Sequence, residues 1–136
     1  MRFHELVAAS AATAEASSRL AKIGQLATLL ERVAPDEVDA AIAFLSGEPR
    51  QGRIGIGPAA IQEARPRSAA SDPVLQLLEV DDAFERIAST TGRGSAVDRV
   101  QQLRDLLSRG TAAEQDFLIR LLFGELRQGV NAIVCL

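Results

Sequence analysis

The stretch SAVDRVQQLRDLLSRGTAAEQDFLIRLLFG, residues 95–124, determines the expected fold. Apolar residues recur in it at steps of three and four, which places them on one side of each of two helices. The helices meet at Gly110, and Thr111 with Glu114 has the T-x-x-E pattern of a capping box that starts the second helix. Ser95 is expected to cap the first helix. The apolar positions are Val97, Val100, Leu103, Leu106, Leu107, Phe117, Leu118, Leu121 and Leu122.

The rest of the chain shows the same kind of pattern between strong helix stops. Apolar residues at three- and four-residue steps predict a helix over residues 14–33. Pro35 ends that helix and stands in the first turn of the next, which runs to about Leu45. A further helix begins near Leu75 and stops at residues 91–92. The apolar face of the first of these helices consists of Leu20, Ile23, Leu26, Leu29, Leu30 and Val33.

Two stretches rich in glycine or proline separate these helices. Between Arg50 and Gly57 the pattern QGRIGIGP (residues 51–58) predicts a constrained loop with Ile54 and Ile56 turned inward, and a short helix is expected to begin at Pro58. Residues 65–73, RPRSAASDP, are polar, contain two prolines and predict a flexible surface linker within the domain.

Composition favours helices over sheets. The chain has 136 residues, its hydrophobic fraction is 47%, and its aromatic fraction is only 4% with no Trp or Tyr. We therefore expect an all-α fold, a single-domain multi-helix bundle of six or seven helices built from helical hairpins over residues 1–136. The helices on either side of Pro35 and of Gly110 look like two similar hairpins, without a residue-level repeat strong enough to indicate duplication.

Several function classes are excluded by what the sequence lacks. One cysteine, Cys135, and one histidine, His4, cannot make the usual zinc sets or an internal disulfide. No signal peptide is expected, and no stretch reaches the ~18 apolar residues of a membrane span, so that a cytoplasmic protein without membrane contact is expected. Asp81 and Asp82 are adjacent and point to different sides of a helix, which makes them a poor acid/base pair for an enzyme.

Positive charge is concentrated in two parts of a chain whose net charge is -3. Residues 50–67 and 91–109 are locally positive, whereas acidic side chains gather elsewhere. Within the second part TGRGS, residues 91–95, combines glycines, a hydroxyl, a guanidinium and the start of a helix, which is a combination that binds phosphate. Taken alone, the turn is more simply explained by a helix stop at Gly92 and a helix cap at Ser95.

Three further segments could contact a nucleic acid, although each alone also has a plain structural explanation. Arg19 and Lys22 are neighbours on one side of a helix, and Arg53 precedes a G-x-G loop. Residues 124–129, GELRQG, place an arginine and a glutamine between two glycines. The candidate DNA-binding residues are Ser18, Arg19, Lys22, Arg53, Gly55, Gly92, Arg93, Gly94, Ser95, Arg99, Gly124, Arg127, Gln128 and Gly129.

Four segments carry a resemblance to a known family. They are SSRLAKIGQLATLL (residues 17–30), IGIG (54–57), TGRGS (91–95) and EQDFLIRLLFGELRQG (114–129). In this order they resemble the N-terminal DNA-binding domain of ATP-dependent DNA ligases, in particular bacterial ligases that carry it ahead of the catalytic core. The resemblance implies a non-catalytic helical domain that packs against the minor groove of duplex DNA on both sides of a nick. It also implies strand joining in repair, replication or recombination, with Arg19, residues 92–95 and Arg127 facing the strands.

Two features depart from the family pattern. Glu125 is acidic where the resemblance suggests a more basic, DNA-facing turn. The only lysine, Lys22, is followed by Ile-Gly-Gln and does not stand in the K-x-D-G pattern that takes up AMP. The chain itself is therefore expected to need no cofactor. ATP and Mg are implied only for the parent ligase, whose catalytic core is the implied partner in the longer protein.

The sequence ends at VNAIVCL, residues 130–136, where the family continues with more helices. This tail is expected to be truncated and to expose apolar surface that favours self-association. An excised piece, a truncated gene product and a stand-alone relative remain open as origins. The alternative function is a helical protein-interaction or self-association module that binds no DNA.

Overall fold

A computed structural model describes residues 1–126, and in them all named elements are helices. The expected all-α fold is confirmed, and no helix of the described part is long and apolar enough to cross a membrane. In chain order the elements are α1 (Phe3–Glu15), α2 (Arg19–Glu31), the short 3₁₀ helix η1 (Pro35–Glu37), α3 (Val38–Ser46), α4 (Pro58–Ala64), α5 (Leu77–Ser89), α6 (Ser95–Ser108) and α7 (Ala112–Leu122).

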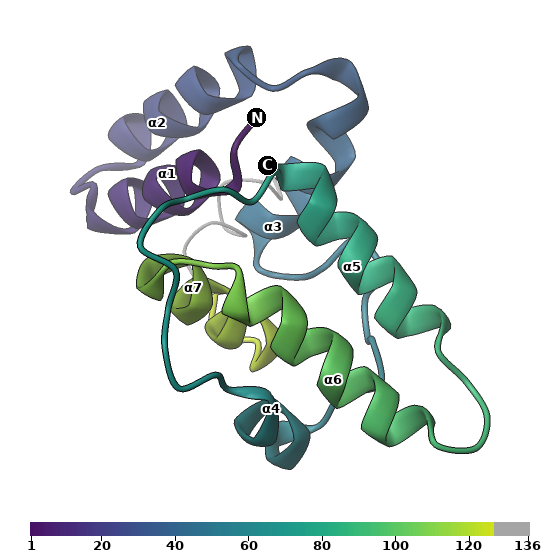
Figure 1. Cartoon of the computed structure of the whole chain (residues 1–136). Helices are drawn as coiled ribbons and strands as arrows, with labels where there is room; N and C mark the ends of the chain where they lie inside the picture. Colours follow the sequence, from purple (N-terminus) through teal and green to yellow (C-terminus); the bar gives the residue numbers. More distant parts are fainter. Residues whose placement is uncertain (127–136) are drawn as a thin grey trace.

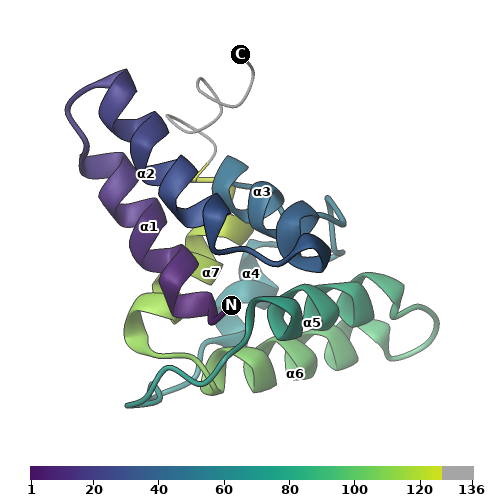
Figure 2. The same cartoon turned by 90° about the horizontal axis from the view of Figure 1, so that it is seen from above.

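Two helical hairpins frame the molecule, and α3 and α7 pack between them (Figures 1 and 2). One hairpin is α1 with α2, and the other is α5 with α6. The short helix α4 packs against α6. The hairpin partner of α2 is therefore α1, a helix that the sequence patterns did not predict. The reason is that α1 is rich in alanine and buries only Phe3, Leu6 and Thr13. These residues are too few to indicate an apolar helix face in the sequence.

Four phenylalanines from four helices form the centre of the core. Phe3 of α1 lies edge-to-face against Phe44 of α3 and Phe117 of α7, with ring centroids 5.6 Å apart in both pairs. Phe44 contacts Phe84 of α5 in the same way at 6.0 Å. Such pairs add about 0.5–1.5 kcal/mol each beyond the area that they bury. Phe3 thus connects the first hairpin to both central helices.

The predictions for α6 and α7 are largely confirmed. Thr111 caps α7, since its hydroxyl accepts the Glu114 N–H at 3.3 Å and Glu114 accepts the Thr111 N–H at 2.9 Å. Val97 is 73% exposed, and Leu122 is only partly buried. Ser95 does not cap α6, because Gly94 holds the cap position with φ 78° and Ser95 is the first helical residue. The remaining predicted apolar residues are buried: Val100, Leu103, Leu106, Leu107, Phe117, Leu118 and Leu121.

The single helix predicted over residues 14–33 is wrong. The chain turns after α1, and α2 starts at Ser18, whose hydroxyl accepts the Ala21 N–H at 3.1 Å. Only Leu26 and Leu29 of the predicted apolar face are fully buried. Val33 is partly buried, and the rest are exposed because only one side of α2 meets the body of the protein: Leu20 is 81% exposed, Ile23 40% and Leu30 37%.

The segments between helices agree with the expected stops. Pro35 opens η1, and the helical run that follows ends at Gly47 in the left-handed conformation. Ile54 is buried and Ile56 partly buried, and α4 starts at Pro58 as predicted. Residues 65–73 contain no helix, and the Ala70 N–H donates to the Gly110 carbonyl at 2.9 Å, while their flexibility stays a prediction. The tail prediction for residues 130–136 lies outside the described residues.

A buried ion pair ties the first residue to η1 and predicts acid sensitivity. The Met1 ammonium donates to Glu37 Oε2 at 2.6 Å, and the ammonium is the main cause that lowers the pKa of Glu37 below its ordinary value of 4.5. A lowered pKa in the folded state stabilises the fold above the unfolded pKa, and this contribution disappears as pH falls through the folded value. We expect Glu37→Gln to lower the free energy of unfolding by about 1–2 kcal/mol at pH 7.

Urea titrations of the protein and of Glu37→Gln at pH 7 and pH 3 measure this contribution. The difference between the two proteins should shrink at pH 3, because the ion pair is lost progressively as falling pH protonates Glu37. A difference that is unchanged between the two pH values would contradict the ion-pair explanation.

Candidate nucleic-acid interface

The loop between α3 and α4 is anchored on α5 by a buried carboxylate. Asp81 accepts from Nε and Nη2 of Arg50 at 3.1–3.3 Å and from the Gln51 amide at 3.2 Å. Glu85 adds a second, exposed ion pair to Arg50 at 3.3 Å. The Asp81 carboxylate raises the pKa of Arg50. Arg50 and Gln51 therefore have a structural role. Their contacts with Asp81 fix the position at which the loop of residues 52–57 begins.

Residues 52–57 then run past the first turns of α6. Gly55 has φ +79°, and a Cβ at this position would lie 3.1 Å from Cζ and 3.2 Å from Nε of Arg99. Arg99 Nη2 donates to the Thr90 carbonyl at 2.6 Å, so that one side chain joins the loop to the end of α5. The Nε of Arg99 is buried and has no hydrogen-bond partner. The glycine is needed here for both its backbone conformation and its missing side chain.

Gly55→Ala should destabilise the protein by about 1–2 kcal/mol, because alanine is strained in the left-handed region and its Cβ meets the Arg99 guanidinium. Gly57→Ala is the matched control, since Gly57 has φ -90° and nothing within 4 Å of an added Cβ. Chemical denaturation of both variants measures the difference. Equal stability of the two would show that the approach of Arg99 to Gly55 places no constraint on the loop.

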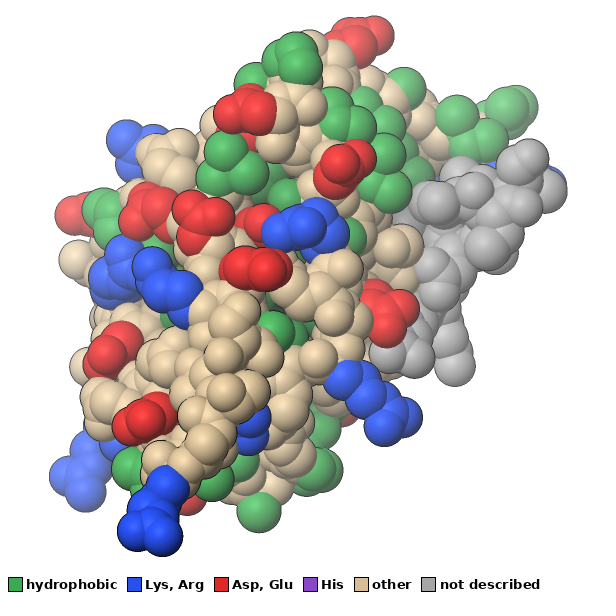
Figure 3. Space-filling model, turned by 90° about the vertical axis from the view of Figure 1, so that its right-hand side faces the viewer, with side chains coloured by type: hydrophobic (Ala, Val, Ile, Leu, Met, Phe, Trp, Pro, Cys, Tyr) green, Lys and Arg blue, Asp and Glu red, His purple; other side chains and the backbone are tan. Residues whose placement is uncertain are grey.

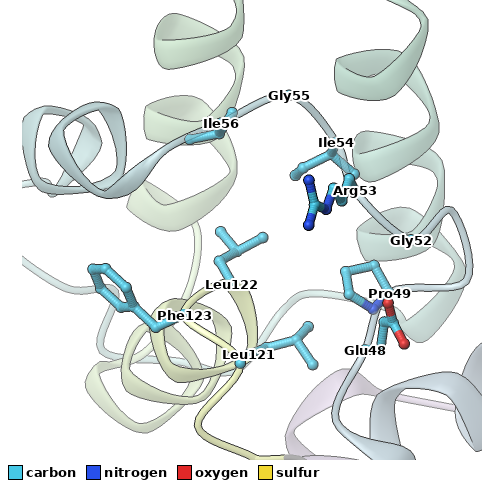
Figure 4. A pocket seen from close by; sticks show the side chains of 11 residues that line it. Glu48, Pro49, Gly52, Arg53, Ile54, Gly55, Ile56, Leu121, Leu122 and Phe123 are labelled. Atoms are coloured by element: carbon cyan, nitrogen blue, oxygen red, sulfur yellow. The ribbon is translucent and has the colours of Figure 1, made fainter.

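A cleft of about 520 Å³ separates this loop from the end of α7 (Figure 4). Arg53, Ile54, Gly55 and Ile56 form one wall, and residues 121–124 form the other. The close-up shows Leu122 and the Arg53 guanidinium in the space between the two walls. The structure thus brings the predicted segments around Gly55 and Gly124 together, although they lie far apart in the sequence.

In the glycine turn before α6, two of the backbone N–H groups are already hydrogen-bonded within the protein. Gly92 and Gly94 have φ +93° and +78°, which explains why glycine stands at both positions. The Ser95 N–H donates to the Gly92 carbonyl at 3.2 Å, and the Asp98 N–H donates to the Gly94 carbonyl at 3.1 Å. These two N–H groups are therefore not free for a phosphate. What the turn offers outward is the exposed Arg93 at its tip.

The two locally positive parts of the sequence lie side by side in space. Helix α4 packs on α6, and Arg104 Nη2 donates to the Glu63 carbonyl at 2.6 Å. Several of the arginines in these parts are exposed, and their guanidinium groups make no hydrogen bond or ion pair with any residue from 1 to 126, which leaves these groups available to an anionic partner. They are Arg53, Arg65, Arg67 and Arg93. Arg53 stands in the loop and Arg93 at the tip of the turn described above, whereas Arg65 and Arg67 follow α4, and only Arg53 and Arg93 were predicted as site residues.

The α2 start lies apart from the other candidate residues. Ser18, Arg19 and Lys22 stand at the turn between α1 and α2, at the opposite end of the molecule from the turn between α5 and α6 (Figures 1 and 2). The side chains of Arg19 and Lys22 make no hydrogen bond or ion pair within the described part of the chain. Three further candidates, Arg127, Gln128 and Gly129, lie outside the described residues.

The surface is mixed in charge and not uniformly basic. Figure 3 shows acidic and basic side chains interspersed over the face on the right-hand side of Figure 1. An anionic ligand would therefore bind to a few individual cations of this surface. With a net charge of -3, the protein as a whole does not attract an anion over a long range.

The described residues do not fit a nucleotide-transfer or metal site. Lys22 is half-buried on α2 beside Ile23 and Gly24, far from the cleft. Among residues 1–126 no group of three or more His, Cys, Asp or Glu side chains could hold a metal ion. The Asp81 carboxylate is held in an ion pair with Arg50, and Asp82 is exposed to solvent. No reaction step with ATP or Mg is assigned to these residues.

Comparison with known proteins identifies the class of this helical domain. The family model described as "DNA ligase N terminus" matches residues 58–134, which is more than half of the chain. The chain therefore belongs to the DNA ligase N-terminal family.

The relatives found by sequence agree with the family. The chain is 47% identical over 130 residues to a "Probable DNA ligase" of Anaeromyxobacter sp. (strain Fw109-5), covering 95% of this chain and 25% of the relative. It is 46% identical over 125 residues to proteins of the same description from Mycolicibacterium gilvum and Saccharopolyspora erythraea, covering 92% of this chain and 24% of each relative. The chain thus spans about a quarter of the length of the curated relatives that it matches.

Proposed function

We propose that this chain is a non-catalytic DNA-binding domain that grips the sugar-phosphate backbone of duplex DNA around a nick for an ATP-dependent DNA ligase. The observation that carries the proposal is the group of unpaired arginines at the adjoining loop, α4 and α5–α6 turn, in a chain of the DNA ligase N-terminal family. Arg53 and Arg93 present free guanidinium groups from glycine-rich loops, where a phosphate can come close to the backbone.

Recognition by this surface would be of backbone and shape. The exposed free cations are few and come from different elements, namely a loop, the segment after α4 and the turn between α5 and α6, and no single helix carries them. Contacts of this kind position a protein on DNA without reading its sequence. A ligase must act at nicks in any sequence, which suits such a mode. In the longer protein, the partner of this domain would be the catalytic core, which would supply the chemistry with ATP and Mg.

Fluorescence anisotropy with a labelled nicked duplex tests the proposal directly. We expect binding that weakens with salt, and a triple variant Arg19→Ala, Arg53→Ala, Arg93→Ala that binds at least about tenfold more weakly with a salt slope lower by about 3. Arg32→Ala is the control for charge, because Arg32 is held in an exposed ion pair with Glu5. The proposal is wrong if the protein fails to bind at low salt, or if the triple variant binds as the control does.

A second candidate function rests on the exposed apolar side of α2. Leu20, Ile23 and Leu30 are 81%, 40% and 37% exposed, which is unusual for large apolar residues on one helix. If α2 were a protein-interaction surface, the chain would self-associate and bind no DNA. Light scattering at high concentration, with Leu20→Gln beside the unchanged protein, distinguishes this candidate from the first.

A further inference from the structure

The Arg99 guanidinium makes contacts inside the protein, although the sequence presents it as a candidate DNA contact. Its Nη2 donates to the Thr90 carbonyl at 2.6 Å, and its Nε is buried without a hydrogen-bond partner in residues 1–126. Its Cζ, Nε and Nη1 lie 3.1–3.4 Å from the position that a Cβ of Gly55 would take. Arg99 is half-buried, so that less of it is open to a phosphate than of the exposed Arg53 and Arg93.

The acceptor of this hydrogen bond, Thr90, is itself fixed at the end of α5. Thr90 is the C-terminal cap residue of α5, and its N–H donates to the Ile87 carbonyl at 3.2 Å. Its hydroxyl donates to the Arg86 carbonyl at 2.8 Å and accepts from the Gln102 amide at 2.9 Å. Because the carbonyl groups at the end of a helix carry partial negative charge, the end of α5 stabilises the Arg99 cation in this place.

On its other side, Arg99 contacts the loop of residues 52–57 at Gly55. The loop is also held at its start, by the hydrogen bonds to the Asp81 carboxylate described above. Arg53 lies on the loop between these two attachments (Figure 4). The backbone around Arg53 is therefore held from both sides, whereas its guanidinium group is free.

The second free arginine stands on the turn that follows Thr90. Arg93 comes three residues after Thr90 and is exposed at the tip of this turn. The turn ends where α6 begins, at Ser95. Arg99 belongs to the first turns of α6, and its contacts therefore connect the base of the turn to the loop that carries Arg53.

We propose that Arg99 is a positioning residue, which holds the loop against the turn and so sets the separation of Arg53 and Arg93 to that of two phosphates in the duplex. This inference rests on the proposed function. Arg99 acts through the two exposed arginines and does not itself contact DNA. Binding groups that are held at a fixed separation before they bind lose less conformational entropy on binding, and this saving increases the affinity.

A phosphate contact and a positioning residue differ in the salt dependence of DNA binding. Each phosphate contact releases condensed counterions, so that the loss of one contact lowers the slope of log K against log salt by about 1. The loss of a positioning residue leaves the number of contacts unchanged. It should therefore weaken binding without changing the slope.

Fluorescence anisotropy with the nicked duplex over a series of salt concentrations measures the affinity and the slope together. We expect Arg99→Ala to bind about threefold to tenfold more weakly than the unchanged protein, with the same slope. Arg93→Ala is the matched comparison, because its loss should reduce the slope by about 1. Leu26→Ala removes a buried side chain of α2, controls for lost stability, and should bind as the unchanged protein does.

The separation itself is measured in the absence of DNA. In a protein with Cys135→Ser, spin labels at Arg53→Cys and Arg93→Cys report the distance between the loop and the turn by pulsed electron paramagnetic resonance. We expect a narrow distance distribution that Arg99→Ala broadens. Gly55→Ala should broaden it as well, because the added Cβ meets the guanidinium from the side of the loop. Without the labels, Gly55→Ala should also weaken DNA binding at an unchanged slope.

The outcomes separate this inference from the proposed function. Failure of the unchanged protein to bind DNA at low salt would overturn both. If the protein binds and Arg99→Ala lowers the slope as Arg93→Ala does, Arg99 is a phosphate contact and the positioning role is rejected. The role is also rejected if neither Arg99→Ala nor Gly55→Ala broadens the distance distribution. Because the contact is disturbed from both sides, one variant that fails to fold leaves the other to decide.

Discussion

Phe3→Ala should lower the free energy of unfolding by about 3–5 kcal/mol. Phe3 is fully buried and contacts Phe44 and Phe117 edge-to-face, so that its removal leaves a cavity where α1, α3 and α7 meet. The backbone of Phe3 is also held in place, because its N–H donates to the Leu75 carbonyl at 2.9 Å beside the antiparallel bridge between Arg2 and Gln76. Urea denaturation followed by circular dichroism measures the loss.

Val97→Ala is the control for this prediction. Val97 is 73% exposed on α6, and its truncation should change stability by less than about 0.5 kcal/mol. A Phe3→Ala protein as stable as Val97→Ala would mean that α1 contributes little to the core.

Asp81→Ala should cost about 2–3 kcal/mol and should loosen the loop that carries Arg53 and Gly55. Asp81 is buried and accepts from both Arg50 and Gln51, and its removal leaves these two donors without their main partner. We expect faster amide hydrogen exchange in residues 50–57 and weaker DNA binding, although Asp81 itself would not touch DNA.

Asp82→Ala is a closely matched control, because Asp82 is the exposed neighbour on the same helix. It removes the same charge without removing an anchor. If both variants changed exchange and DNA affinity equally, the effect of Asp81 would be one of net charge, and the anchoring role of the Arg50 contact would be rejected.

Local patterns predicted the parts of the fold that depend on local physics. The capping box of Thr111 and Glu114, the stop at Gly47 and the helix start at Pro58 follow from a few neighbouring residues, and the structure contains all three. Periodicity was weaker where a helix buries few large residues. It therefore missed α1, and on α2 it predicted as buried three residues that α2 exposes.

For the candidate site, the sequence named the residue types, and only the structure showed how these residues lie relative to one another. Glycines at positive φ and free arginines at Arg53 and Arg93 agree with the phosphate-binding interpretation. Arg99 looked equally available in the sequence, but it is half-buried and bonded to the Thr90 carbonyl. The anchor formed by Asp81 and Arg50 was missed, because nothing local relates two residues on different elements.

By itself, the sequence determined that this protein is helical, where several helices begin and end, and that it belongs to the DNA ligase N-terminal family. These properties depend on propensity, capping and similarity, which act over short spans or residue by residue. Only the tertiary structure decided which arginines are anchored and which segments share the cleft. Those properties depend on contacts between residues that lie far apart in the sequence.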